Sequence, residues 1–172
     1  MLAALAAAPR AVWYVGGSPE EVEAAVRKTV LRAAQTGELP LLVAYDLPYR
    51  DCSQYGSGGA RDAPAYQAWI DGFSRGIGGD KAVVILEPDS LGIIPYNTAL
   101  DGGSDWCKPT VTGAQGEPIP APGTTAAEHY ALLASAIDRL ARGAPNALVY
   151  LDGTHSAWLP VGEIAYRLAK AG

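Results

Sequence analysis

The stretch AVVILEPDS at residues 82–90 joins a continuous apolar run to a pair of carboxylates, and it decides the predicted fold class. Its first five residues are apolar and largely β-branched without alternation, which is typical of a strand buried on both faces. Three more runs have this character: AVWYV at 11–15, LLVAY at 41–45 and ALVYL at 147–151. Repeated runs of this kind predict a parallel sheet.

Helical patterns separate these runs. One helix is predicted to begin at the capping box Ser18–Glu21, with Pro19 at its first position, and to end at Gly37. Further helices are predicted to begin near Pro64, at Thr125 and near Pro160, and another over residues 1–8. The alternation of helix and strand predicts an α/β fold with helices outside a parallel sheet, either doubly wound or a barrel.

The composition bounds the class of protein. With 172 residues, 49% of them hydrophobic and 18% charged, the chain suits one globular domain with a sizeable core. A net charge of −5 argues against nucleic acid or an anionic membrane as a partner and is compatible with a neutral sugar. Residues 1–8 lack a basic leading segment, so the chain as given is expected to carry no export signal.

Polar and aromatic side chains gather where the predicted strands end, at the edge where parallel α/β folds carry their sites. Two long connections, at 51–62 and 91–123, follow strands and are expected at the same edge. The strand ends supply carboxylates, an arginine, a histidine and tryptophans, in the segments 13–17, 46–52, 87–90 and 152–158.

Paired carboxyl groups in such a cleft favour acid–base chemistry, because one of two neighbouring groups keeps its proton near neutral pH. A protonated carboxyl group can protonate a glycosidic oxygen, and tryptophan rings suit sugar faces. Other chemistries are less well supported, since the chain has neither a phosphate-binding GxxxxGK[ST] loop nor a GxSxG nucleophile motif.

Metal and thiol chemistry are also weakly indicated. His129, which a two-histidine metal site would need, is predicted in a helix far from His155, and no metal or other cofactor is expected. Cys52 and Cys107 are too few for a structural zinc site, and they leave one disulfide or two free thiols open.

Three segments resemble the conserved blocks of glycoside hydrolase family 6. VAYDLPYRDCS at 43–53, followed by GSGG at 56–59, resembles the first signature; VVILEPDSL at 83–91 resembles the second; YLDGTHSAW at 150–158 is similar to a third block. The resemblance spans nearly the whole chain in the family's order. It implies a distorted TIM-like α/β barrel and a secreted cellulase without cofactor, an endoglucanase or cellobiohydrolase that cleaves β-1,4-glucan with inversion.

The resemblance also implies roles for individual residues. Asp89 matches the proton donor, and Asp51 matches the aspartate that raises the donor's pKa and orders the catalytic water. Cys52 matches a half-cystine whose partner would be Cys107. The implied sugar-contacting or site-shaping residues are Trp13 (a platform), Tyr45 (sugar distortion), Arg50 (steadying the carboxylates), Asp152 (shaping the site), His155 and Trp158 (contacts beyond the cleavage point).

Four further residues near these motifs are not expected to take part in catalysis. Glu87 is expected to be a hydrogen-bonding residue rather than a second catalyst, and Asp46 a strand-end or turn residue. Asp105 and Trp106 are expected to face solvent in the long loop.

The family domain is longer than this chain, in which four strands are predicted. Residues 1–172 are therefore expected to form a single domain, the N-terminal portion of a family 6 barrel, with self-association through open edges. The expected function is hydrolysis of cellulose or a related β-glucan. The alternatives are an inactive remnant with at most weak glucan binding through Trp13 and Trp158, and an α/β barrel hydrolase of different chemistry.

Overall fold

The sheet is parallel, as predicted. The computed structural model describes residues 10–172; the helix predicted over residues 1–8 lies outside them. Four strands hydrogen-bond in the order β1-β2-β3-β6. They are β1 (Ala11–Tyr14), β2 (Leu41–Ala44), β3 (Ala82–Leu86) and β6 (Ala147–Leu151). Each lies within one residue of its predicted bounds.

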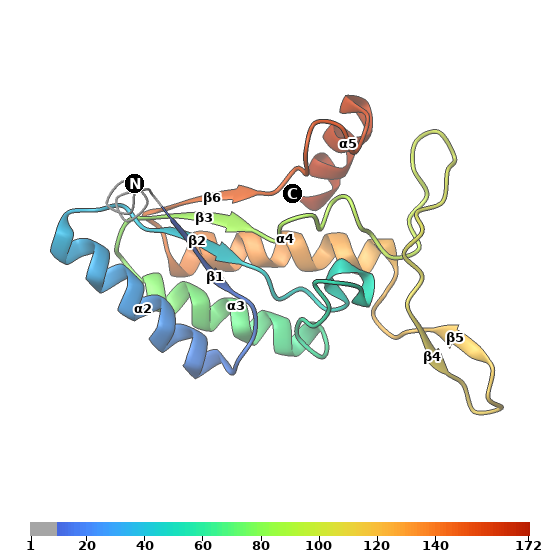
Figure 1. The fold of residues 1–172 in the computed structure, drawn as a ribbon, viewed down its shortest axis with the longest axis horizontal. Coiled ribbons are helices and arrows are strands. Elements are labelled where there is room, and N and C mark those ends of the chain that lie inside the picture. Colours follow the sequence, from blue (N-terminus) through green and yellow to red (C-terminus); the bar gives the residue numbers. More distant parts are fainter. Residues whose placement is uncertain (1–9) are drawn as a thin grey trace, which may run out of the picture.

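Helices alternate with these strands, and three of them lie along one face of the sheet (Figure 1). They are α2 (Pro19–Thr36), α3 (Ala63–Ile77) and α4 (Ala126–Gly143), with α5 (Val161–Ala171) after β6. The predicted capping box forms: Ser18 Oγ accepts from the Glu21 amide, and the Glu21 carboxylate accepts from the Ser18 amide. Gly37 ends α2 with a φ of 69°, a left-handed conformation that favours glycine. None of the helices within residues 10–172 has the length and apolarity needed to cross a membrane.

The core lies between the sheet and α2, α3 and α4. Leu42, Val84 and Leu86 point to this side and are fully buried. They pack in one cluster with apolar side chains from the helices, among them Val26, Trp69, Phe73, Leu133 and Leu140.

The prediction that all four strands are buried on both faces is wrong for β1 and β6. Trp13 on β1 is 54% exposed, and Leu148 and Tyr150 on β6 are 57% and 56% exposed. The reason is that α2, α3 and α4 cover a single face, so alternate side chains of β6 reach solvent. In β1, at the other side of the sheet, only Tyr14 is buried.

The long connection after β3 contains a hairpin that the sequence pattern does not predict. β4 (Thr110–Thr112) pairs antiparallel with β5 (Pro118–Pro120), and the hairpin projects away from the sheet (Figure 1). Both strands are exposed and short, so they lack the apolar pattern by which the sheet strands were found.

Candidate active site at the carboxyl edge

Asp89 lies at the end of β3 and is exposed. Its backbone has a φ of 64°, in the left-handed region that is uncommon for residues other than glycine. Its amide donates to Asp152 Oδ1 at 2.9 Å, which ties the end of β3 to the segment after β6. The structure therefore brings these two predicted site residues into direct contact.

The pKa of the Asp89 carboxyl is raised above its ordinary value. Partial burial is the largest cause, followed by repulsion from Asp152 and then from Asp51, while His155 acts in the opposite direction. A larger fraction of Asp89 is thus protonated near neutral pH than for a free aspartate. Asp152 contributes more to this rise than Asp51 does, although the resemblance implied that role for Asp51.

Asp51 occupies a strained turn after β2. It belongs to the 3₁₀ helix η1 (Arg50–Ser53), and Tyr49, Asp51, Cys52 and Ser53 all have positive φ. The Asp51 carboxylate accepts from the Gly56 amide at 2.5 Å, closing the turn. Asp51 and Asp89 line the same narrow hollow, together with Tyr45 and Arg50. Such strain persists only where the surroundings hold it.

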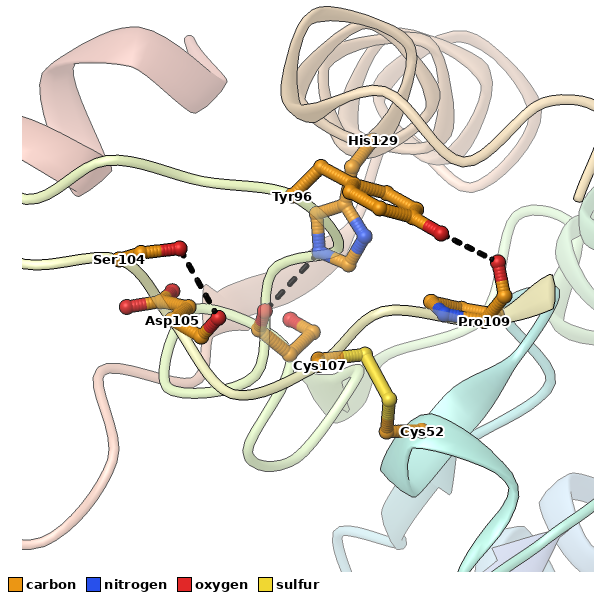
Figure 2. The surroundings of a disulfide bond; sticks show 8 residues. Cys52, Tyr96, Ser104, Asp105, Cys107, Pro109 and His129 are labelled. Carbon is orange, nitrogen blue, oxygen red and sulfur yellow. Dashed lines mark hydrogen bonds between the residues drawn. A yellow bond between two sulfur atoms is a disulfide. The ribbon is translucent and has the colours of Figure 1, made fainter. Parts of the chain in front are cut away.

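A disulfide between Cys52 and Cys107 helps to hold this strained turn. It confirms the pairing implied by the resemblance. Figure 2 shows it joining the η1 turn to the long connection after β3. Next to it, the Tyr96 hydroxyl donates to the Pro109 carbonyl oxygen at 2.8 Å and braces the same connection. The disulfide therefore fixes the turn that carries Asp51.

Arg50 organises the backbone around this turn. Its guanidinium donates to the carbonyl oxygens of Val15, Tyr45, Gly56 and Ser57, at 2.6 to 3.3 Å. Its carboxylate partner is the buried Asp46, at 3.8 Å.

Two aromatic side chains stand beside the turn. The Arg50 guanidinium carbon lies 4.8 Å from the centre of the Tyr45 ring. The Tyr45 ring in turn meets Trp13 edge to face at 5.8 Å. An exposed tryptophan packed against Tyr45 provides an apolar surface of the kind that sugar rings stack on.

His155 and Trp158 form a second aromatic pair, with ring centres 5.5 Å apart. His155 Nδ1 accepts from the Ala157 amide at 3.2 Å, so the neutral ring carries its proton on Nε2. Trp158 lies against the backbone of Gly92, where a β-carbon would come within 2.9 Å of the indole. The segment after β6 is therefore packed directly onto the segment after Asp89.

Glu87 is a structural hydrogen-bonding residue, as predicted. It is completely buried, and its two carboxyl oxygens accept from the amides of Asp46 and Leu47 at 3.0 and 3.2 Å. Burial raises its pKa to about 7, against the opposing effect of these hydrogen bonds. Burial likewise raises the pKa of Asp46 to about 6. Glu87 thus joins the end of β3 to the end of β2.

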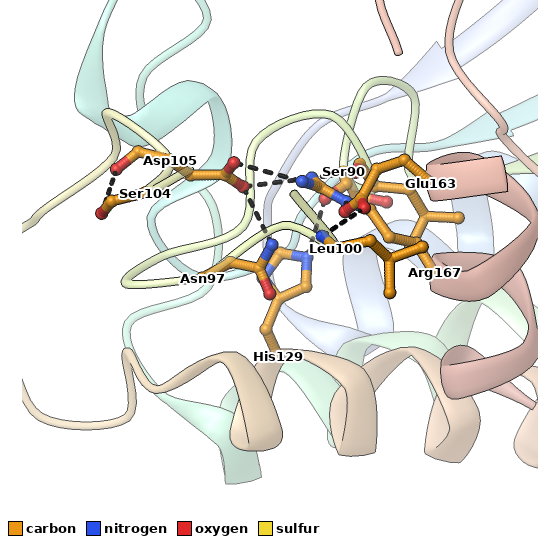
Figure 3. A network of polar contacts seen from close by, with 9 residues as sticks. Ser90, Asn97, Leu100, Ser104, Asp105, His129, Glu163 and Arg167 are labelled. Atoms are coloured by element: carbon orange, nitrogen blue, oxygen red, sulfur yellow. Dashed lines mark hydrogen bonds and ion pairs between the residues drawn. The ribbon is translucent and has the colours of Figure 1, made fainter. Parts of the chain in front are cut away.

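The expectation that Asp105 faces solvent is wrong, while Trp106 is exposed as expected. Asp105 pairs with Arg167 of α5 through the two terminal guanidinium nitrogens, at 3.0 and 3.1 Å (Figure 3). Arg167 is buried and also binds Glu163. The roles of Arg167 and Glu163 and the contact of His129 with Ser90 could not be predicted, because nothing in the local sequence marks a partner on another element.

Metal ligation is not evident at this edge. In the part of the chain that the structure describes, no three His, Cys, Asp or Glu side chains are grouped to hold an ion.

Residues 1–170 match the sequence profile of the family described as Glycosyl hydrolases family 6. The chain belongs to this family. Endoglucanase 1 of Streptomyces sp. (strain KSM-9) is 34% identical over 95% of this chain and 39% of its own length. Endoglucanase A of Thermobispora bispora is 34% identical over 97% of this chain and 32% of its own length.

Solved family 6 structures have the same fold. The endoglucanase Cel6 from Mycobacterium tuberculosis, in complex with methyl-cellobiosyl-4-deoxy-4-thio-β-D-cellobioside, superposes with a TM-score of 0.77 at 31% identity, over 99% of this chain and 50% of that chain. CcCel6C from Coprinopsis cinerea superposes with a TM-score of 0.66 at 23% identity, over 98% of this chain and 44% of that chain. The four parallel strands and their helices correspond to part of the family's distorted TIM-like barrel, which confirms the predicted fold class. This chain spans half or less of the length of each of these relatives.

Proposed function

We propose that this chain acts in the hydrolysis of β-1,4-glucosidic bonds of cellulose or a related β-glucan, with Asp89 as the general acid. The observation that carries the proposal is the exposed Asp89 carboxyl, whose pKa is raised by partial burial and by the neighbouring Asp152 and Asp51. The names of two relatives, both endoglucanases, and the cellobioside-type ligand of the M. tuberculosis enzyme support this choice of substrate.

In this mechanism the Asp89 carboxylic acid gives its proton to the glycosidic oxygen as the bond between that oxygen and the anomeric carbon breaks. A water molecule attacks the anomeric carbon from the opposite face and loses a proton to a base, so the configuration inverts. Asp51, held in the strained η1 turn by Gly56 and the disulfide, orders that water and helps to keep Asp89 protonated. Asp152 shares the second task.

Sugar units on the two sides of the cleaved bond have different aromatic contacts. Trp13, with Tyr45 packed edge to face against it, is the platform on one side. The His155–Trp158 pair contacts the sugar on the other side. Arg50 steadies the carboxylate cluster by fixing the backbone that carries Asp51.

The test is reducing-sugar release from a soluble cellulose derivative by the wild type and by Asp89→Asn. An amide cannot donate the proton, so a loss of roughly 10²- to 10⁴-fold is expected, the usual contribution of a general acid. Asp138→Asn, at an exposed position on α4, is the matched control and should keep wild-type release. Equal release by Asp89→Asn and the wild type would exclude Asp89 as the acid.

A second candidate function is glucan binding without turnover. The exposure of Trp13 on the open face of the sheet favours it. It predicts that cello-oligosaccharides bind with no product formed, and that Trp13→Ala and Trp158→Ala each weaken this binding in calorimetry. Release of sugar by the wild type would exclude it.

We also propose that the chain forms a single domain, the N-terminal part of a family 6 barrel, and that it works outside the cell. Copies of it associate through the open edges of the sheet and the uncovered face beside them. The disulfide supports the location, because disulfides persist in oxidising compartments. The exposed apolar residues Trp13, Leu148 and Tyr150 support the association.

A further inference from the structure

The backbone of residues 89–91, called here the acid-bearing segment, is held by side chains from three later parts of the chain. Asp152, after β6, accepts from the Asp89 amide at 2.9 Å. His129 of α4 contacts the Ser90 carbonyl oxygen at 2.9 Å, and Arg167 of α5 donates to the Leu91 carbonyl oxygen at 2.8 Å. Three successive residues are thus fixed by three separate elements.

The contact of His129 has a defined direction. A carbonyl oxygen only accepts, so Nε2 of the buried His129 must carry the proton that it donates. Burial lowers the pKa of His129 to about 4, which keeps the ring neutral while Asp89 acts. The side chain is therefore a fixed hydrogen-bond donor rather than a proton carrier.

Arg167 links the acid-bearing segment to the middle of the long connection that follows it. Besides Leu91, its guanidinium donates to Asp105 and, through Nε, to Glu163 at 2.5 Å (Figure 3). Glu163 in turn accepts from the Leu100 amide at 2.8 Å. One buried cation thus holds the beginning and the later part of the long connection against α5.

Asp89 needs such restraint, because its φ of 64° is uncommon for a residue with a β-carbon and is held only by its surroundings. Local turns also close on it, since the Gly92 and Ile93 amides donate to the Asp89 carbonyl oxygen at 2.8 and 3.1 Å. If the segment were released, Asp89 would relax to an ordinary conformation and its carboxyl group would turn away from its present neighbours.

We propose that His129 and Arg167 are positioning residues, which hold the acid-bearing segment so that the Asp89 carboxyl group faces the cleft. This inference rests on the proposed role of Asp89 and deepens it. Each residue acts through a backbone carbonyl oxygen, His129 at Ser90 and Arg167 at Leu91. The titratable groups that face Asp89 electrostatically are Tyr45 and Asp51 after β2, and Asp152 and His155 after β6.

The first measurement is a carbon-13 NMR titration of the Asp89 carboxyl group, which needs no turnover. His129→Leu removes the donor, whereas His129→Gln keeps an amide that can reach the Ser90 oxygen. We expect His129→Leu to lower the pKa of Asp89 toward its ordinary value and His129→Gln to leave it as in the wild type. Arg167→Lys keeps the charge but cannot reach all three partners, and it should act like His129→Leu.

General destabilisation is tested by Leu140→Ala, a buried change at the far end of α4 that leaves residues 89–91 untouched. It should reduce the melting temperature without altering the Asp89 titration. If Leu140→Ala lowers the pKa as much as His129→Leu does, or if His129→Leu leaves it unchanged, the proposed positioning role is wrong.

The second measurement is steady-state kinetics on the same soluble cellulose derivative. Misplacing the acid should reduce kcat of His129→Leu by roughly 10- to 100-fold, with KM within about twofold of the wild type. His129→Gln should restore kcat. If kcat is unchanged in His129→Leu, the positioning role is overturned. A wild type without turnover counts against the proposed function, while the NMR titration still decides the positioning role.

Discussion

The two faces of the four-stranded sheet are both apolar, but they differ in how far they are covered. On one face Leu42, Val84 and Leu86 are fully buried under α2, α3 and α4. On the other, Leu148 and Tyr150 of β6 are more than half exposed. The comparison teaches that the covered face holds the packed core, while the open face is where the proposed sugar contact and association would take place.

The largest expected effect is a difference in stability between two matched substitutions, one on each face of the sheet. Leu86→Ala empties space in the packed core and should lower the free energy of unfolding by about 2–5 kcal/mol. Leu148→Ala changes a residue that is 57% exposed, and a loss below about 1 kcal/mol is expected. Urea denaturation measures both. Similar losses from the two variants would mean that the open face is packed in solution.

The same contrast continues beyond the strand ends, where Glu87 is buried and Asp89 is exposed. Because burial raises the pKa of Glu87 from 4.5 to about 7, folding favours its protonated form. The contribution of Glu87 to the free energy of unfolding is fully present below about pH 4.5. It is lost as the pH rises through 7, which lowers the free energy of unfolding by roughly 3 kcal/mol. Glu87→Gln should flatten this part of the stability profile.

Thermal or urea unfolding at a series of pH values between 4 and 8 measures the difference. Glu117→Gln, at an exposed position on the β4–β5 hairpin, is the matched control and should keep the wild-type profile. A Glu87→Gln profile as steep as that of the wild type would show that Glu87 does not titrate in this range.

The smallest expected effect on stability concerns association through the open face. Leu148→Glu places a charge there and should shift sedimentation toward monomer, with a change in unfolding free energy of no more than about 0.5 kcal/mol. Leu31→Glu, at an exposed leucine on α2, should leave the association unchanged. A wild type that is already a uniform monomer at all concentrations would contradict the association.

Much of the site could be predicted because its residues follow strands directly. Asp51 and Asp89 line one hollow, and Asp152 binds the backbone of Asp89, as expected of segments that leave one edge of a parallel sheet. The position of Asp105 was mispredicted for a physical reason. Its partner Arg167 lies 62 residues further along the chain, and a loop carboxylate without a local partner is ordinarily solvated.

The sequence by itself determined the four parallel strands, the helix start at Ser18, the helix end at Gly37 and the motifs that carry Asp51 and Asp89. These features depend on the hydrophobic pattern and on hydrogen bonds between residues a few positions apart, so the local sequence is enough to predict them. Only the tertiary structure decided which face of the sheet is covered and which side chains hold the acid-bearing segment. The contacts of His129 with Ser90 and of Arg167 with Leu91 join residues 39 and 76 positions apart, and such contacts exist only once the helices have packed.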